Sequence, residues 1–213
     1  QRALWLQSCC RKALACLGVE IRIVGDPPTH GLVVANHLGY LDVVVLAAAM
    51  PCFFVAKSEI AGWAFFGAAA RAGGTIFLVR TSRASAGVVA DEITQRLLLP
   101  VPVLLFPEGT STDGSRVLRF HSRLIAPAVD AGAPVTAAAL RYSAEGIVKE
   151  RELCWFDDAM FLPHLWATLG RTGLKTELRF GVPRVYSDRI AAAKETQAIV
   201  MAMRAQGAQR SRV

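Results

Sequence analysis

The sequence lacks the signals of several common protein classes. It has no segment of about 18 uninterrupted apolar residues, the length that a membrane-spanning helix needs, because Pro51 interrupts the longest apolar stretch, residues 43–56. It has no Gly-x-Ser-x-Gly turn, which carries the nucleophile of many hydrolases, and no Gly-x-Gly-x-x-Gly after a predicted strand. It also lacks runs of Lys and Arg, so nucleic acid is not an expected partner.

Cysteine is scarce, and its spacing does not suit a metal site or a set of disulfides. The five cysteines are an odd number, and no pair of them has the spacing typical of zinc ligands. Most of them lie within apolar stretches. We therefore expect buried free thiols in a reducing compartment, and no bound metal.

The residues that are abundant make the chain apolar and basic. Its 213 residues, of which 53% are hydrophobic, suffice for one domain with a full core. The formal net charge is +7, which favours anionic partners such as acidic lipid head groups. An ordinary basic surface accounts for the charge equally well.

Strand-like runs and helical periodicities alternate along the chain. Strands are predicted at 19–24, 32–35, 52–56, 75–79, 101–106, 135–140 and 177–180, and helices at 41–50, 59–72, 84–99, 121–131, 155–169 and 188–206. This order predicts an α/β fold over residues 19–206, a single domain with a mostly parallel central sheet flanked by helices. Residues 207–213 are expected to form a frayed tail.

Residues 1–18 are predicted to form an amphipathic helix that precedes this domain. Its apolar residues recur at helical spacing, namely Leu4, Trp5, Leu14, Cys16 and Leu17. Two placements remain open, because such a helix can dock on its own domain or lie in a lipid interface.

The first cluster of polar residues follows the predicted strand at 32–35. His37 comes after this strand, and Asp42 opens the next apolar helix. Positions five apart on one helix point about 140° apart, so His37 must precede the helix, with Gly39 allowing the chain to turn back. Asp42 can then accept the imidazole N–H and leave the other ring nitrogen as a base. The alternative is that Asp42 only caps the helix.

The second cluster, Phe106-Pro107-Glu108-Gly109-Thr110, follows the predicted strand at 101–106. Ligands bind at the carboxyl ends of strands in α/β sheets, so this turn is expected at the same edge as His37. Glu108 is expected either to bind hydroxyl groups of a substrate or to brace the loop. The backbone N–H groups around Gly109 and Thr110 are candidates for holding an oxyanion.

A third strand, predicted at 75–79, places Arg80 at its end, where a guanidinium suits a phosphate. In this order the clusters resemble the glycerolipid acyltransferase family, which includes lysophosphatidic acid acyltransferases. The four blocks of the family resemble Asn36-His37-x4-Asp42, Gly74…Phe77…Arg80, Phe106-Pro107-Glu108-Gly109-Thr110 and the apolar strand near Pro134–Leu140. Residues 56–60, which include Lys57, are similar to the stretch between the first two blocks.

The resemblance implies a membrane-associated O-acyltransferase in which His37 is the general base and Asp42 supports it. It implies substrate binding by Lys57, Arg80, Glu108, Gly109 and Thr110. The implied acceptor is a lysolipid, first 1-acyl-glycerol-3-phosphate and alternatively a lyso-ornithine lipid. The implied donor is acyl-CoA or acyl carrier protein, without a cofactor or metal. The implied location is the cytoplasmic face of the bacterial inner membrane, with the chain peripheral or anchored by a segment outside it.

The chain departs from the family pattern at two places. Ser111 stands where many members have Arg after the Glu-Gly-Thr, and Val135-Thr136-Ala137 replaces a segment that usually contains Pro. The missing Arg weakens the expectation of a phosphate-bearing acceptor. The version Glu-Gly-Thr-Ser-Thr-Asp-Gly is similar to lyso-ornithine lipid acyltransferases and to a branch of bacterial lysophosphatidate enzymes. Outside this class, a serine-type lipid hydrolase and a non-catalytic lipid-binding module remain open.

Overall fold

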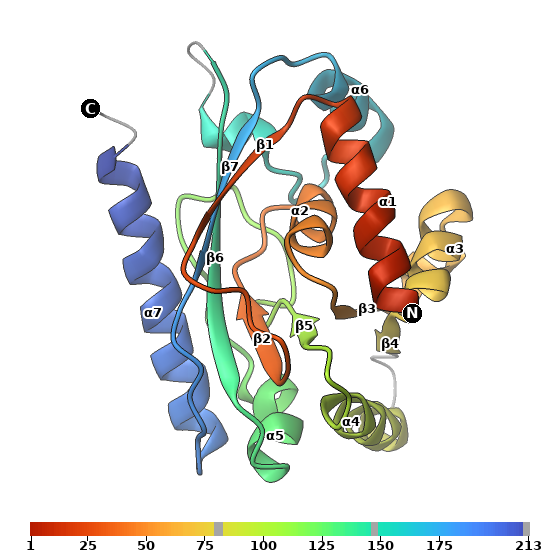
Figure 1. The fold of residues 1–213 in the computed structure, drawn as a ribbon, viewed down its shortest axis with the longest axis vertical. Coiled ribbons are helices and arrows are strands. Elements are labelled where there is room, and N and C mark those ends of the chain that lie inside the picture. Colours follow the sequence, from red (N-terminus) through yellow and green to blue (C-terminus); the bar gives the residue numbers. More distant parts are fainter. Residues whose placement is uncertain (79–82, 146–148, 211–213) are drawn as a thin grey trace.

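The computed structural model describes residues 1–78, 83–145 and 149–210. A seven-stranded sheet lies between two layers of helices (Figure 1). The strands are β1 (Glu20–Val24), β2 (Leu32–Ala35), β3 (Phe53–Lys57), β4 (Ile76–Leu78), β5 (Val103–Leu105), β6 (Val135–Ser143) and β7 (Lys175–Phe180). The helices are α1 (Arg2–Cys16), α2 (Leu41–Ala49), α3 (Ala64–Gly73), α4 (Arg83–Leu97), α5 (Ser122–Asp130), α6 (Phe161–Leu169) and α7 (Arg189–Arg210), with 3₁₀ helices η1 (Ser58–Gly62) and η2 (Glu150–Leu153).

The strand order in the sheet is β1-β7-β6-β2-β5-β3-β4. Strands β6, β2, β5, β3 and β4 run parallel to one another, whereas β7 is antiparallel to β6 and parallel to β1. The predicted α/β fold with a mostly parallel sheet is thereby confirmed. The five strands that run in one direction bring their carboxyl ends to one edge, where ligands bind in open α/β sheets.

Alternate residues of the central strands supply two separate hydrophobic cores. Val33 and Ala35 of β2 pack in the core with α1 and α2, whereas Leu32 and Val34 pack in the core with α4, α5 and α7. All four side chains are completely buried, as expected for a strand covered on both faces. Figure 1 shows α7 along one face and α1, α2 and α3 on the other.

Helix α1 docks on its own domain, but along a different stripe from the predicted one. Its buried residues are Ala3, Gln7, Cys10 and Leu14, and the predicted apolar residues Leu4, Trp5, Cys16 and Leu17 are exposed. The docking is partly polar, because Gln7 and Arg11 both donate to the carbonyl of Ala48 at the end of α2 (3.4 and 2.9 Å). A purely apolar pattern could not reveal these contacts.

Three boundaries differ from those predicted. Residues predicted as one helix at 59–72 form η1 and α3, and α6 starts at Phe161 rather than at 155. Helix α7 continues to Arg210, so residues 207–210 are helical and not part of a frayed tail.

The cysteines are only partly as expected. Cys9 and Cys16 are exposed, contrary to the expectation of buried thiols, whereas Cys10, Cys52 and Cys154 are buried.

Within the described ranges, no helix combines the length and the apolar character that crossing a bilayer requires.

Candidate active site

The predicted polar clusters meet at the carboxyl ends of the central strands. His37 follows β2, Glu108 follows β5, and Lys57 is the last residue of β3. Strand β5 lies between β2 and β3, so these three positions follow one another along the same edge of the sheet. Lys57 is exposed there. Arg80, the predicted head-group ligand, lies outside the described residues.

Asn36 determines where the chain leaves the sheet. The regular pairing of β2 with β6 ends at Ala35 and Ala138. The side-chain amide of Asn36 then accepts from the N–H of Leu140 (2.8 Å) and donates to the carbonyl of the same residue (3.2 Å). The amide thus takes the place of a strand neighbour in the sheet, and the backbone is free to turn towards His37.

The side chains of His37 and Asp42 are directly bonded. Nδ1 of His37 lies 2.7 Å from Oδ2 of Asp42. A carboxylate can only accept, so the Nδ1 proton is directed at Asp42. None of the described residues bonds to Nε2, and the His37 side chain is 23% exposed, so this nitrogen can take a proton from an incoming group.

Gly39 makes the tight turn between the two residues possible. Its φ is 150°, and a Cβ at this position would lie 2.9 Å from the backbone nitrogen and the Cβ of Trp155. A side chain here would therefore push Trp155 away. The N–H of Trp155 donates to the carbonyl of Leu38 (2.8 Å), which fixes the same turn from outside.

Asp42 is completely buried and accepts several hydrogen bonds besides that from His37. The N–H groups of Leu38 and Gly39 donate to Oδ2 at 2.6 and 3.0 Å, and the hydroxyl of Tyr142 in β6 donates to Oδ1. Asp42 lies within the first turn of α2, whose N-cap is Tyr40, and its side chain makes no cap hydrogen bond to this helix. The predicted support of the imidazole is therefore present, whereas the alternative of a helix cap is wrong, because the backbone donors to Asp42 lie in the turn before α2. The contact with Tyr142 was not predicted.

Glu108 braces the main chain on both sides of the site. Its Oε1 accepts from the N–H of His37 (2.8 Å) and its Oε2 from the N–H of Leu118 (2.6 Å). The residue is only 4% exposed. Burial raises the pKa of the carboxyl, and the two backbone donors oppose this rise. Of the two predicted roles, the geometry favours bracing over direct contact with a substrate.

The loop after Glu108 also holds His37 through its backbone. The N–H and the hydroxyl of Thr112 both lie within reach of the His37 carbonyl, at 2.9 and 3.3 Å. The N–H of Gly109 is directed at the carbonyl of Phe106 (3.1 Å), so it closes the turn. The exposed Thr110 and its neighbour Ser111 have no acceptor for their N–H groups among the described residues, which leaves these two as the oxyanion donors to consider.

Aromatic rings line the site on two sides. The ring of Phe106 stacks on that of His37 with centroids 4.1 Å apart and an interplanar angle of 14°. This contact fixes the orientation of the imidazole plane. A second group of mutually packed rings, here called the aromatic cluster, begins at the residue before α2 and comprises Tyr40, Trp63, Phe66, Trp155 and Phe161.

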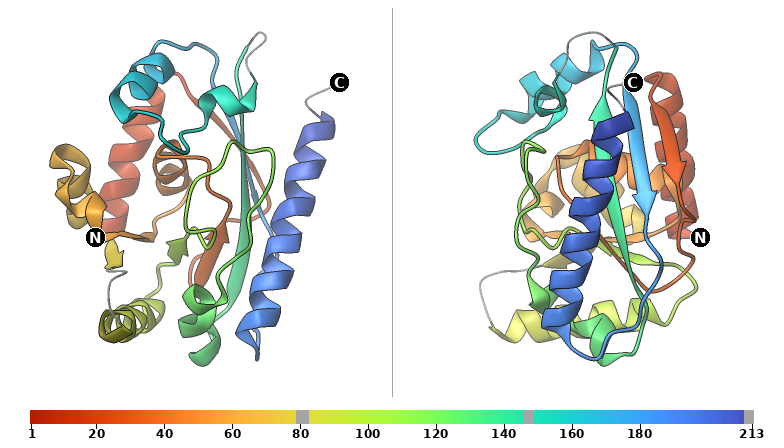
Figure 2. Two further views of the ribbon diagram at one scale, coloured as in Figure 1. Left: turned by 180° about the vertical axis from the view of Figure 1, so that it is seen from behind. Right: turned by 90° about the vertical axis from the view of Figure 1, so that its left-hand side faces the viewer.

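Helix α6 joins the site through this cluster. Phe161 packs edge-on against Tyr40 at 5.1 Å, and the Tyr40 hydroxyl lies 3.0 Å from Nδ1 of His164 and 3.2 Å from the Thr168 hydroxyl. Other apolar side chains in and beside α6 are 38–73% exposed. They are Met160, just before the helix, and Leu162, Trp166 and Leu169 within it. In the right-hand view of Figure 2, α6 and the loop after β5 lie on one side of the molecule and α1 on the other.

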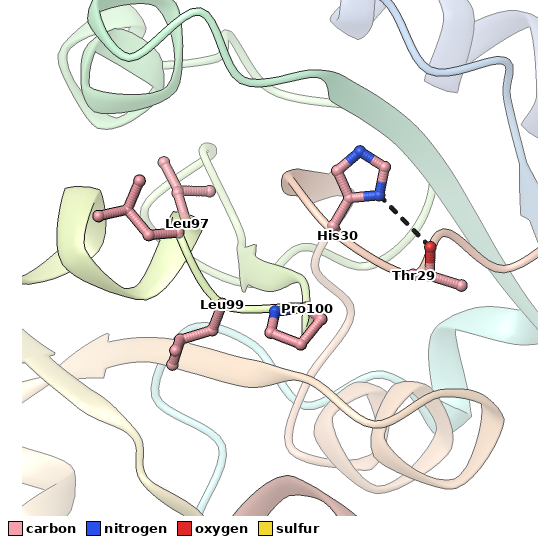
Figure 3. A pocket seen from close by; sticks show the side chains of 6 residues that line it. Thr29, His30, Leu97, Leu99 and Pro100 are labelled. Atoms are coloured by element: carbon pink, nitrogen blue, oxygen red, sulfur yellow. Dashed lines mark hydrogen bonds between the residues drawn. The ribbon is translucent and has the colours of Figure 1, made fainter.

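A separate cavity of about 320 Å³ lies at the opposite edge of the sheet. Residues 29–30, ahead of the amino end of β2, and residues 97–100, at the end of α4 and beyond, line it. Figure 3 shows His30 beside it, with its Nδ1 3.4 Å from the hydroxyl of Thr29. His30 is exposed and lies a full strand away from His37. It therefore belongs to a different surface.

The chain is similar to known acyltransferases. The sequence profile of the family described as Acyltransferase matches residues 23–141. A lyso-ornithine lipid O-acyltransferase of Rhodobacter capsulatus is 37% identical over 95% of this chain and 75% of its own length. A 1-acyl-sn-glycerol-3-phosphate acyltransferase of Neisseria gonorrhoeae is 36% identical, over 61% of this chain and 52% of its own.

A solved structure has the same fold. The crystal structure of the 1-acyl-sn-glycerophosphate (LPA) acyltransferase PlsC from Thermotoga maritima superposes with a TM-score of 0.72. The match covers 96% of this chain and 78% of the other, at 19% sequence identity. It therefore supports the fold alone.

Proposed function

Because the chain belongs to the acyltransferase family, we propose that it transfers a fatty acyl group from a thioester donor to the free hydroxyl of a lysolipid, with His37 as general base. The observation that carries the proposal is the 2.7 Å contact between Nδ1 of His37 and Oδ2 of Asp42. It leaves Nε2 as the basic nitrogen at the edge of the sheet where ligands bind.

The reaction has one bond-forming step at the acyl carbonyl. Nε2 of His37 takes the proton of the acceptor hydroxyl while the oxygen attacks the thioester carbon. The tetrahedral oxyanion then expels the thiolate, which receives the proton from the imidazolium. Asp42 stabilises the positive charge on His37 in between, as the carboxylate of a hydrolase triad does. The thioester supplies the acyl group in activated form, so no covalent acyl-enzyme is needed.

The loop after β5 is the proposed source of oxyanion donors. The N–H groups of Thr110 and Ser111 take this role, because that of Gly109 already closes the turn. One such donor contributes about 3 kcal/mol to the stabilisation of the transition state. Glu108 acts indirectly by holding the backbone of His37, and Lys57 and Arg80 are proposed to bind the anionic parts of the substrates.

Two acceptors are supported, each by its own observation. Lyso-ornithine lipid is favoured by the relative that matches along most of its length, and by Ser111, which stands where a phosphate-binding Arg is usual. A 1-acyl-glycerol-3-phosphate is favoured by the shorter match to the enzyme from Neisseria. The proposed donor is acyl-CoA or acyl carrier protein.

The proposed partner surface is a membrane. The acceptor lysolipid resides in a bilayer. Helix α6, whose Leu162 and Trp166 are exposed, lies on the side of the molecule where the loop after β5 lies. A helix that presents Trp and Leu in this way can lie in the interface between head groups and acyl chains. We propose attachment at the cytoplasmic face of the membrane, where the thioester donors are made.

The test compares two histidine variants of the purified chain. With acyl-CoA, and with lysophosphatidate and lyso-ornithine lipid offered in parallel, we expect thiol release that depends on the acceptor and a diacyl product of the expected mass. His37→Ala should lower the rate by about 10²–10⁴-fold, the usual contribution of a general base. The matched control is His30→Ala, at the opposite edge of the sheet, which should keep the wild-type rate.

The same assay separates the competing functions. A His37→Ala chain with the wild-type rate would refute the proposed mechanism. Release of free fatty acid without an acceptor would indicate a hydrolase instead. Binding of lipid without turnover would indicate a non-catalytic module.

A further inference from the structure

Tyr142 is a buried polar residue for which the proposed reaction gives no role. It lies in β6, one residue beyond the segment that matches the family profile, and is 3% exposed. Its hydroxyl donates to Oδ1 of Asp42, the oxygen that His37 does not use. It therefore contacts the catalytic pair from inside the protein and not from the substrate side.

The two oxygens of Asp42 are held very unequally. Oδ2 accepts from Nδ1 of His37 and from the N–H groups of Leu38 and Gly39. In the part of the chain that the structure describes, the Tyr142 hydroxyl is the donor to Oδ1. A completely buried carboxylate oxygen without a donor is unfavourable. Without Tyr142, the carboxylate would gain by rotating or by taking up a proton, and either change would weaken its bond to His37.

The backbone that carries the Tyr142 side chain is itself held in place. The backbone N–H of Tyr142 donates to Oε1 of Glu150 (3.0 Å), and Oε2 of Glu150 accepts from Arg204 of α7 (2.9 Å). Burial first, and the negative charge of Asp42 second, raise the pKa of Tyr142 well above its usual value, so the hydroxyl stays a donor. A fixed donor of this kind opposes rotation of the group that it binds.

We propose that Tyr142 is a positioning residue, whose hydroxyl holds Oδ1 of Asp42 so that Oδ2 remains directed at His37 while the imidazole takes the proton. The inference rests on the proposed function, because it assigns a second support to the same general base. It predicts that Tyr142 influences the chemical step and not the binding of either substrate.

The test removes this hydroxyl and leaves the ring in place. Tyr142→Phe should lower kcat by about 10- to 100-fold, the range that the loss of a hydrogen bond to a charged group allows. The KM values for donor and acceptor should stay within about twofold of wild type. The control is Tyr186→Phe, which removes the hydroxyl of a partly buried tyrosine that packs against the other core and should leave kcat unchanged.

A second readout does not depend on turnover. Long-range proton–nitrogen NMR correlations of ¹⁵N-labelled His37 report which ring nitrogen carries the proton. In the wild type and in Tyr186→Phe we expect the neutral ring with its proton fixed on Nδ1. In Tyr142→Phe we expect a mixture of the two tautomers, because Asp42 no longer selects one.

The outcomes distinguish this inference from the proposed function. A wild-type chain that transfers to neither acceptor would refute the proposed function. The tautomer measurement would still test whether the Tyr142 hydroxyl fixes the orientation of Asp42. The inference is overturned if Tyr142→Phe keeps both kcat and the Nδ1 tautomer, or if it changes KM and kcat equally. It is also overturned if the variant fails to fold, because the hydroxyl would then serve stability alone.

Discussion

Replacing Glu108 with Gln is the sharpest test of the brace that joins the two sequence clusters. The two carboxylate oxygens accept from the N–H groups of His37 and Leu118 at 2.8 and 2.6 Å. Glutamine retains one acceptor, and its NH₂ group would face the other N–H, so one backbone donor loses its partner. This substitution changes hydrogen bonding and charge with almost no change of volume.

The expected cost follows from burial and charge. A lost hydrogen bond that leaves a buried donor unsatisfied costs about 1–3 kcal/mol. The raised pKa of Glu108 shows that its charge is unfavourably buried, and removal of the charge returns part of that cost. We therefore expect a net loss of about 2 kcal/mol in the free energy of unfolding, or a Tm lower by about 4–8 °C for a chain of this size.

Urea unfolding monitored by circular dichroism would measure this loss, with Glu20→Gln as the control. The Glu20 side chain is 74% exposed and 3.8 Å from Lys175, so its replacement should change the free energy of unfolding by less than about 0.5 kcal/mol. Because Glu108 holds the backbone of His37, kcat of its variant should also fall. Equal stability of the two variants, with full activity of Glu108→Gln, would refute the bracing role.

Two further predictions concern the far side of the site and the membrane. Arg204→Met should lower the free energy of unfolding by about 3 kcal/mol, because it leaves the carboxylate of Glu150, only 15% exposed, without its cation. Denaturant titration should show a much smaller loss for Arg22→Met, whose side chain is 58% exposed. Trp166→Ser should weaken binding to anionic lipid vesicles about tenfold in co-sedimentation, because one large apolar side chain leaves the interface. Val182→Ser, at an exposed apolar residue after β7, should have little effect on binding to the vesicles. Equal binding by the two variants would exclude α6 as the helix that contacts the membrane.

The pairing of His37 with Asp42 could be predicted because it depends on local geometry. A strand end, a glycine and the first turn of a helix lie within the eight residues 35–42, so few conformations are available to the segment. The position of Glu108 at the same edge followed from the parallel order of the strands. Both predictions used information that lies close together in the sequence or in the topology of the sheet.

The remaining support of the site depends on contacts between residues that are far apart in the sequence. Tyr142 is 100 positions from Asp42, and Asn36 is 104 from Leu140. Neither residue type predicts such a partner, because a tyrosine in a strand such as β6 is expected to be an ordinary core residue, and an asparagine after a strand is expected to lie in a turn. The buried side of α1 was predicted wrongly for a similar reason, since Gln7 is buried and makes a hydrogen bond to Ala48 that periodicity does not reveal.

The place of β2 in the sheet has a consequence for how the protein opens. The strand that carries His37 is fourth in the order of seven, with three strands on either side. Thermal fraying starts at the borders of a sheet, here β1 and β4, where each strand has a single neighbour. Such partial opening has to pass several strands before it reaches His37. The outer strands can therefore open locally while the contact between His37 and Asp42 stays intact.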